Sequence, residues 1–141
     1  MPLLTEKDQT AIQERFKELS GPVKLVNFTQ ELECEFCHET RRLLEDVAAL
    51  SDKLSLEVYN FQLDKEKVEQ YKIDKIPATV VEGEKDYGIR LYGLPSGYEF
   101  SVLIDDILAV SKGQSGLHPE TVARLRDLVQ PLHLQVFVTP T

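Results

Sequence analysis

The spacing of hydrophobic residues changes several times along the chain, and each spacing predicts a different kind of element. Three segments repeat apolar residues every three or four positions, as a helix with one buried face does. These segments span residues 5–20, 37–51 and 99–111. Segment 64–71 is short and charged, and we expect it to form a helix as well. Thr5 and Asp8 have the spacing of a capping box, so we expect the first helix to begin there.

Four shorter segments are rich in β-branched and aromatic residues, which predicts strands. They span residues 23–29, 54–61, 78–81 and 89–92. The turn residues Gly83 to Asp86 separate the last two and predict a hairpin. Segment 54–61 has too little polarity on either face for the edge of a sheet. We therefore expect that strand to be buried between helices.

The order of these elements predicts an α/β fold over residues 1–115. Two parallel strand-helix steps are followed by an antiparallel pair of strands, which makes a mixed central sheet with helices on both faces. The two cysteines, Cys34 and Cys37, fall where the first strand gives way to the second helix.

Residues 116–141 form a second region of different character. Pro119 starts a predicted helix that a later proline ends, and residues 134–141 then have the composition of a strand. Segment 135–139 superposes on segment 25–29, and each follows a helical segment closed by a proline. This match indicates an internal repeat, in which a second unit begins near the end of the sequence.

Composition and charge narrow the class of protein. Of the 141 residues, 42% are hydrophobic and 28% are charged, which is typical of a folded globular chain. The formal net charge of −8 disfavours nucleic acids, whose phosphates are held by clustered basic side chains. No apolar run approaches the ~20 residues of a membrane span, and the N-terminus lacks the features of a signal peptide. We expect a cytoplasmic protein that binds neither membrane nor nucleic acid.

The cysteine pair carries the candidate chemistry. A reducing compartment disfavours a purely structural disulfide, which leaves a reversible one. Two cysteines three positions apart at a helix start have α-carbons near the separation that a disulfide tolerates. The partial positive charge of the helix N-terminus stabilises a thiolate on Cys34, the predicted nucleophile. Cys37 lies one turn deeper and is predicted to attack the mixed disulfide that Cys34 forms.

Two other interpretations of the pair stay open. A zinc site needs four ligands, and His38 with His118 or His133 would have to complete it. Cys37 and His38 are adjacent and would diverge on a helix, so we expect no metal and no cofactor. An inert pair of buried thiols is the second interpretation, and it does not explain the position at a strand-to-helix junction.

Three motifs together resemble the N-terminal unit of the glutaredoxin-like protein disulfide oxidoreductases of thermophilic prokaryotes. They are CEFC at 34–37, IDKIPAT at 73–79 and YGIRLYGLPSGYEF at 87–100. The resemblance implies a thioredoxin-like fold and exchange of disulfides with protein dithiols and disulfides. It also implies an electron donor similar to thioredoxin reductase.

The resemblance assigns a role to the second motif. In thioredoxin-like proteins a cis-proline faces the two sulfurs, and Pro77 occupies the matching position. The resemblance therefore implies a cis bond between Ile76 and Pro77, with an ordinary trans bond as the alternative. Pro77 would border the substrate groove, and the backbone of Ile76 would pair with an extended substrate.

The resemblance also bears on the end of the chain. Members of that family are similar to two thioredoxin-fold units in tandem, each with its own CxxC motif. This sequence stops where the second motif would begin, so we expect a shortened form with an orphaned last strand. An unpaired strand exposes backbone groups, and we expect residues 134–138 to pair with a sheet edge of the same molecule or of a second copy in a homodimer.

Several residues depart from the pattern of thioredoxins. These proteins bury an Asp as proton acceptor on the strand before the cysteines, where this chain has Asn27. Glu57 on the neighbouring strand is a substitute candidate, against the alternative of a solvated charge. Glu35, between the sulfurs, is expected to raise the pKa of Cys34 and make the couple more reducing. Phe36 either shapes the rim of the site or belongs to the core.

Two alternative functions remain open at this stage. One is a non-catalytic or redox-sensing module that scaffolds a second, catalytic unit. The other is a glutaredoxin that uses glutathione, although no Gly-Gly pair follows the strand after Pro77 to receive that tripeptide.

Overall fold

A computed structural model describes residues 3–139 of the chain. Its centre is a four-stranded sheet in the order β2-β1-β3-β4. The strands are β1 (Val23–Thr29), β2 (Leu54–Asn60), β3 (Ala78–Glu82) and β4 (Asp86–Tyr92). β1 pairs with β2 in parallel, while β1 with β3 and β3 with β4 are antiparallel. The predicted mixed sheet and its hairpin are therefore confirmed.

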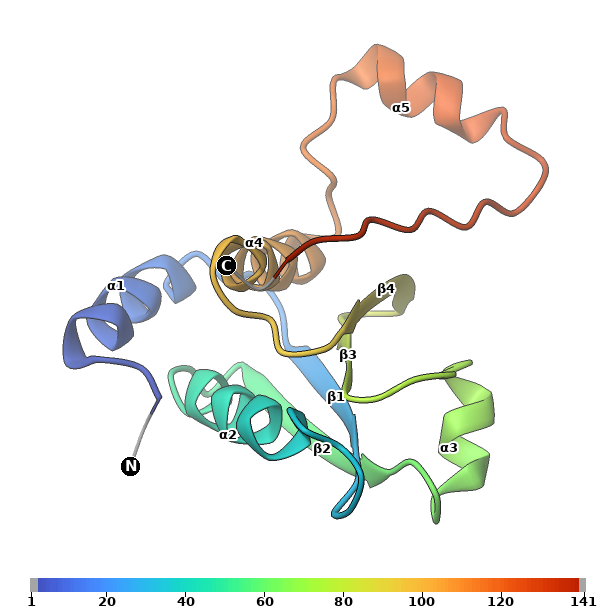
Figure 1. The fold of residues 1–141 in the computed structure, drawn as a ribbon. Helices are drawn as coiled ribbons and strands as arrows, with labels where there is room; N and C mark the ends of the chain where they lie inside the picture. Colours follow the sequence, from blue (N-terminus) through green and yellow to red (C-terminus); the bar gives the residue numbers. More distant parts are fainter. Residues whose placement is uncertain (1–2, 140–141) are drawn as a thin grey trace.

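Helices cover both faces of this sheet, as the order of elements predicted (Figure 1). The helices of the main unit are α1 (Glu6–Phe16), α2 (Cys37–Ala48), α3 (Lys65–Gln70) and α4 (Tyr98–Lys112). α1, α2 and α4 share one apolar core with the sheet, and α3 covers the opposite face. None of the helices between residues 3 and 139 has the length and apolar character to cross a membrane.

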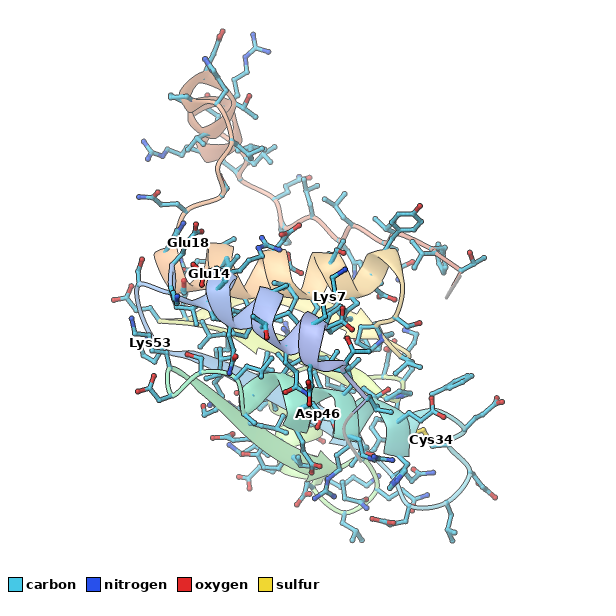
Figure 2. The ribbon with its side chains drawn as sticks, turned by 90° about the vertical axis from the view of Figure 1, so that its left-hand side faces the viewer. Lys7, Glu14, Glu18, Cys34, Asp46 and Lys53 are labelled. Atoms are coloured by element: carbon cyan, nitrogen blue, oxygen red, sulfur yellow. A yellow bond between two sulfur atoms is a disulfide. The ribbon has the colours of Figure 1, made fainter. Side chains whose placement is uncertain are left out.

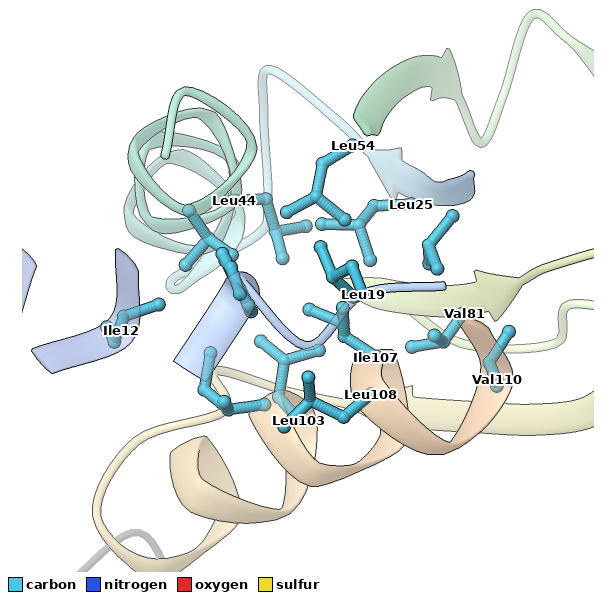
Figure 3. Packing of buried hydrophobic residues seen from close by; sticks show 14 of the residues in the cluster. Ile12, Leu19, Leu25, Leu44, Leu54, Val81, Leu103, Ile107, Leu108 and Val110 are labelled. Carbon is cyan, nitrogen blue, oxygen red and sulfur yellow. The ribbon is translucent and has the colours of Figure 1, made fainter. Parts of the chain in front are cut away.

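The larger core lies between the sheet and the three-helix layer (Figure 3). Leu25 from β1 and Leu44 from α2 are fully buried there, together with Ile107 from α4. The side chains of β1 alternate between the two faces, because successive residues of a strand point to opposite sides. Val26 and Phe28 therefore belong to the second core, beneath α3.

Local signals placed most helix ends correctly. The capping box is formed: Thr5 Oγ1 accepts from the Asp8 backbone N–H at 3.2 Å, and the Asp8 carboxylate accepts from the Thr5 N–H at 3.3 Å. α1 ends at Phe16 rather than at Ser20, although Leu19 beyond it stays buried. β4 begins three residues before the predicted Ile89, so its exposed first half extends the hairpin.

The prediction that the strand at 54–61 is buried between helices is wrong. β2 is an edge strand, and after the buried Leu54 its residues are exposed or half-buried. β3 pairs with the opposite side of β1, which puts β1 at the centre and leaves β2 outside. The few polar side chains of β2 suffice for an edge because α2 and the region of α3 cover its two faces in part.

The predicted C-terminal helix forms, but the predicted strand does not. α5 (Pro119–Arg126) stands away from the sheet, and residues 129–139 follow it without secondary structure (Figure 1). Pairing of residues 134–138 with the sheet of the same molecule is therefore a wrong prediction. Phe137 is 89% exposed, since none of the strands in residues 3–139 covers it. The last two residues of the predicted strand lie outside the described part of the chain.

Candidate functional site

The two cysteines form a disulfide at the start of α2 (Figure 2). Their α-carbons are 5.5 Å apart, within the range that a disulfide needs. Cys37 is the first residue of α2 and is 1% exposed, while Cys34 lies in the preceding turn and is half-buried. The sequence predicted this junction and this difference in exposure.

The helix end beside the disulfide offers a positive electrostatic environment. Phe36 precedes α2, and its side chain makes no capping hydrogen bond. The Thr40 N–H makes the first backbone bond of the helix, to the Phe36 carbonyl at 3.0 Å. The backbone N–H groups that precede Thr40 in the chain have no acceptor within the helix. Such groups carry the partial positive charge of a helix N-terminus. This charge stabilises a nearby thiolate once the disulfide opens.

Pro77 lies at the same end of the sheet as the disulfide. The bond between Ile76 and Pro77 is cis. Ala78, the next residue, pairs with Phe28 near the end of β1. Pro77 therefore lies beside the end of β1, from which the chain continues to the cysteines. The Pro77 carbonyl accepts a hydrogen bond from the Gly93 N–H at 2.8 Å. This bond ties the proline loop to the segment between β4 and α4.

Asn27 is fully buried on the face of β1 that α2 covers. Its Nδ2 donates to the Ala78 carbonyl on β3 at 3.1 Å. Leu25, two residues earlier and therefore on the same face, packs in the core with Leu44 of α2. The buried position expected for the counterpart of a thioredoxin Asp is thus occupied by an amide, which does not ionise and cannot take up a proton at neutral pH.

Glu57 lies on the other face of the sheet. It is in register with Val26, which belongs to the core beneath α3. Its carboxylate accepts from Tyr59 Oη at 2.7 Å and lies 3.5 Å from Lys24 Nζ. The Tyr59 hydrogen bond lowers the pKa of Glu57, so the group is ionised at neutral pH. The structure therefore does not bring Glu57 to the cysteines, and the solvated-charge interpretation describes it better.

The rim around the disulfide is partly apolar. Phe36 is 42% exposed beside Cys37, so it belongs to the rim and not to the core. Leu32 is also exposed, and the sequence analysis did not single it out. Glu35 and His38 are exposed as well. A partner protein that reaches Cys34 would meet both apolar and charged side chains here.

A shallow hollow of about 260 Å³ opens beside Cys34. It is lined by Thr29, Gln30, Glu31, Cys34, His38 and Arg41. Arg41 Nε donates to Glu45 Oε1 at 2.9 Å along the surface of α2. The hollow gives the exposed side of the disulfide an opening toward solvent.

The structure does not assemble the alternative zinc ligands. Among residues 3–139, no three His, Cys, Asp or Glu side chains lie together as a metal site would require. His118 instead caps α5, where its Nδ1 accepts from the Glu120 N–H at 3.2 Å.

Comparisons with solved structures place this geometry among redox proteins. A protein disulfide oxidoreductase from Aeropyrum pernix matches with a TM-score of 0.80 and 27% identity, over 88% of this chain and 55% of that one. The alkylhydroperoxide reductase AhpF from Enterococcus faecalis matches with a TM-score of 0.78 and 25% identity, over 89% and 61%. This chain thus spans little more than half the length of either protein.

Single-unit thioredoxins match more distantly. A thioredoxin of Fasciola hepatica is 16% identical with a TM-score of 0.52, over 68% of this chain and 90% of that one. The fold is thioredoxin-like. The predicted fold class and the resemblance to protein disulfide oxidoreductases are both confirmed. No protein-family model and no curated protein matches the chain.

Two residues near the site were missed by the sequence analysis. Thr40 and Thr79 are fully buried polar residues. Thr40 lies on α2, which begins with Cys37, and Thr79 lies on β3, which follows Pro77. Thr40 interrupts the apolar stripe of α2, and that interruption was the available signal. Thr79 gave no signal, because threonine is common in strands.

Proposed function

We propose that this chain is a thiol-disulfide oxidoreductase that exchanges disulfides with other proteins through Cys34 and Cys37. The observation that carries the proposal is the Cys34–Cys37 disulfide at the N-terminus of α2 in a thioredoxin-like fold. The difference in burial supports the division of roles, since Cys34 is accessible and Cys37 is enclosed.

Reduction of a substrate proceeds in two exchanges that balance in sulfur bonds and electrons. The Cys34 thiolate attacks one sulfur of the substrate disulfide, forms a mixed disulfide and releases one substrate thiolate. The Cys37 thiolate then attacks Cys34, closes the internal disulfide and releases the second substrate thiolate. The substrate gains two electrons and the cysteine pair loses two, and the reverse sequence oxidises a substrate dithiol.

The proline loop supplies the docking edge for an extended substrate. Pro77 is buried at the level of the cysteines, and Ile76 is half-buried before it. We assign Pro77 to the border of the groove and the Ile76 backbone to pairing with the substrate strand. Glu35 and Phe36 modulate the site from the rim. The match to an alkylhydroperoxide reductase supports a reductase partner as electron donor. We propose that the exchange takes place in the cytoplasm.

Single-cysteine variants test the assignment. Cys34→Ser is expected to abolish reduction of insulin by a dithiol, because no thiolate remains to attack the substrate. Cys37→Ser is expected to accumulate covalent complexes, because the mixed disulfide is no longer resolved. Glu57→Gln on the opposite face of the sheet serves as the matched control and should retain activity. Normal activity of Cys34→Ser would contradict the proposed function.

We further infer that residues 134–138 pair with a sheet edge of a second copy. The segment exposes Leu134, Val136 and Phe137, and an apolar segment of this kind lowers its free energy by adding a strand to an open edge. Sedimentation or light scattering should show a dimer at micromolar concentration. A monomer across the concentration series would contradict this inference.

A further inference from the structure

Within residues 3–139, three buried side-chain oxygen atoms have no hydrogen-bond partner. They are Asn27 Oδ1, Thr40 Oγ1 and Thr79 Oγ1, and each of the three residues is fully buried. Leaving such a group unpaired costs about 1–3 kcal/mol. Three of them in one region therefore call for a role that the oxidised state does not reveal.

The three residues lie on the same side of the sheet. Asn27 of β1 pairs directly with Thr79 of β3, so their side chains share a face. Val81, two residues after Thr79, packs in the core beneath the helices, and this fixes the face as the one that α2 covers. Thr40 is on the buried side of α2. We call these three residues the polar layer.

The polar layer lies between the apolar core and the disulfide. α2 runs back along β1, so its first turn is level with the end of that strand. Thr40 is three residues into the helix, about 4.5 Å along its axis. Asn27 is two residues before the strand end, about 6.6 Å back. Leu25 and Leu44 of the core come deeper on both elements.

Thr40 is the member that faces the enclosed sulfur. Residues three apart on a helix lie one above the other, and side chains lean toward the helix N-terminus. The side chain of Thr40 therefore leans toward the turn that carries Cys37, and both residues belong to the buried stripe of α2. A threonine hydroxyl donates one hydrogen bond and accepts others, so it can bond a thiolate.

We propose that the polar layer holds Cys37 in its reduced form, with the Thr40 hydroxyl donating a hydrogen bond to the Cys37 thiolate. Thr79, which is paired with Asn27 across the strands, completes the layer by donating its own hydroxyl to Asn27 Oδ1 or to Thr40 Oγ1. When an external dithiol gives two electrons to the disulfide, the S–S bond breaks and Cys37 is left as a buried anion. Thr40 stabilises that anion and so favours the reduced pair over the disulfide.

This inference rests on the proposed function, and it makes Thr40 a positioning residue with no contact to the substrate. It explains how the thiol of Cys37 can react although Asn27 stands where thioredoxins bury an Asp. A buried amide does not take up the proton of the resolving thiol, whereas a neighbouring donor lowers the pKa of that thiol directly. The chain thereby keeps an enclosed sulfur reactive without a buried carboxylate.

Thr40→Val tests the inference, because it removes the hydroxyl and keeps the shape. The equilibrium constant for reduction by glutathione should shift about tenfold toward the disulfide, a potential about 30 mV more negative. In the Cys34→Ser background, the pKa of Cys37 should rise by about one unit, measured from the pH dependence of its Cβ chemical shift. Thr40→Ser, which restores the hydroxyl, should return both values toward wild type.

Val47→Ala is the matched control, since it creates a cavity on the same buried face of α2 without touching the polar layer. It should lower the melting temperature and leave the potential unchanged. Thr79→Val changes the layer from the sheet side and should move the potential in the same direction by a smaller factor. If Thr40→Val does not fold, Thr79→Val and Thr40→Ser decide the matter.

The outcomes separate the two proposals. A wild-type chain whose disulfide does not equilibrate with glutathione would contradict the proposed function itself. A reversible wild-type couple with unchanged potentials in Thr40→Val and Thr79→Val would overturn the role of the polar layer alone.

Discussion

Single charges around the disulfide set how readily the cysteine pair gives up electrons. Glu35 stands between Cys34 and Cys37 and is exposed. A carboxylate there opposes the positive helix end, because it disfavours a second negative charge on Cys34. The two effects act on the same sulfur with opposite signs.

Glu35→Gln is expected to lower the pKa of Cys34 by about 0.5 unit, the size of a screened interaction between exposed charges. The reduced form gains stability, so the couple becomes less reducing. Alkylation rates of Cys34 across pH measure the shift, and it should shrink as salt is added. Glu66→Gln, a charge on α3, is the control. An unchanged alkylation profile in Glu35→Gln would show that the helix end alone governs the thiolate.

At the scale of the element, α4 contains a carboxylate whose burial lowers the stability of the fold when it is ionised. Asp106 is half-buried on this helix beside Asp105. Burial, with a smaller contribution from Asp105, raises the pKa of Asp106 to about 6. Asp105 is itself bonded to Arg15 of α1 at 2.7 Å. The ionised form of Asp106 is therefore disfavoured in the folded chain.

The sign of the pH dependence follows from that shift. The folded pKa lies above the ordinary 3.8, so the associated stability is complete below pH 4 and is lost as the pH rises through 6. Asp106→Asn should stabilise the protein at pH 8 by about 1 kcal/mol, after allowance for solvent screening. Urea unfolding at pH 4 and pH 8 measures this gain. Equal gains at both pH values would contradict the electrostatic explanation.

At the scale of the whole molecule, residues 3–139 form one packed unit followed by a C-terminal segment, residues 117–139, that contributes no residue to either core. Of the residues that the structure describes, the last buried hydrophobic one is Val110, near the end of α4. α5 contains no buried residue, and the apolar side chains beyond it are exposed. We therefore expect the packed unit to determine the stability of the fold and the C-terminal segment to determine self-association.

Deletion of residues 117–141 is expected to leave the melting temperature within about 2 °C of the full chain, since residues 117–139 belong to neither core. The same deletion should abolish the concentration-dependent dimer. Removing α1 is the contrasting control, because Ile12 and Phe16 are buried in the main core. A large loss of stability on deletion of the C-terminal segment would mean that it packs on the sheet in solution.

Features governed by neighbouring residues were determined by the sequence alone. The capping box at Thr5, the helix that starts at Cys37 and the hairpin of β3 and β4 follow from local spacing and turn chemistry. The disulfide belongs to this group, because the short turn that leads from Cys34 into α2 brings the two cysteines within bonding range.

Features governed by strand order were decided only by the tertiary structure. Periodicity shows that a strand has two faces, but it does not show which face a given helix covers. Placement of β3 beside β1 made β2 an edge and set Thr79 opposite Asn27. The register of β2 with β1 put Glu57 on the face away from the cysteines. The polar layer behind Cys37 therefore exists only in the folded chain, where residues distant in sequence meet beneath α2.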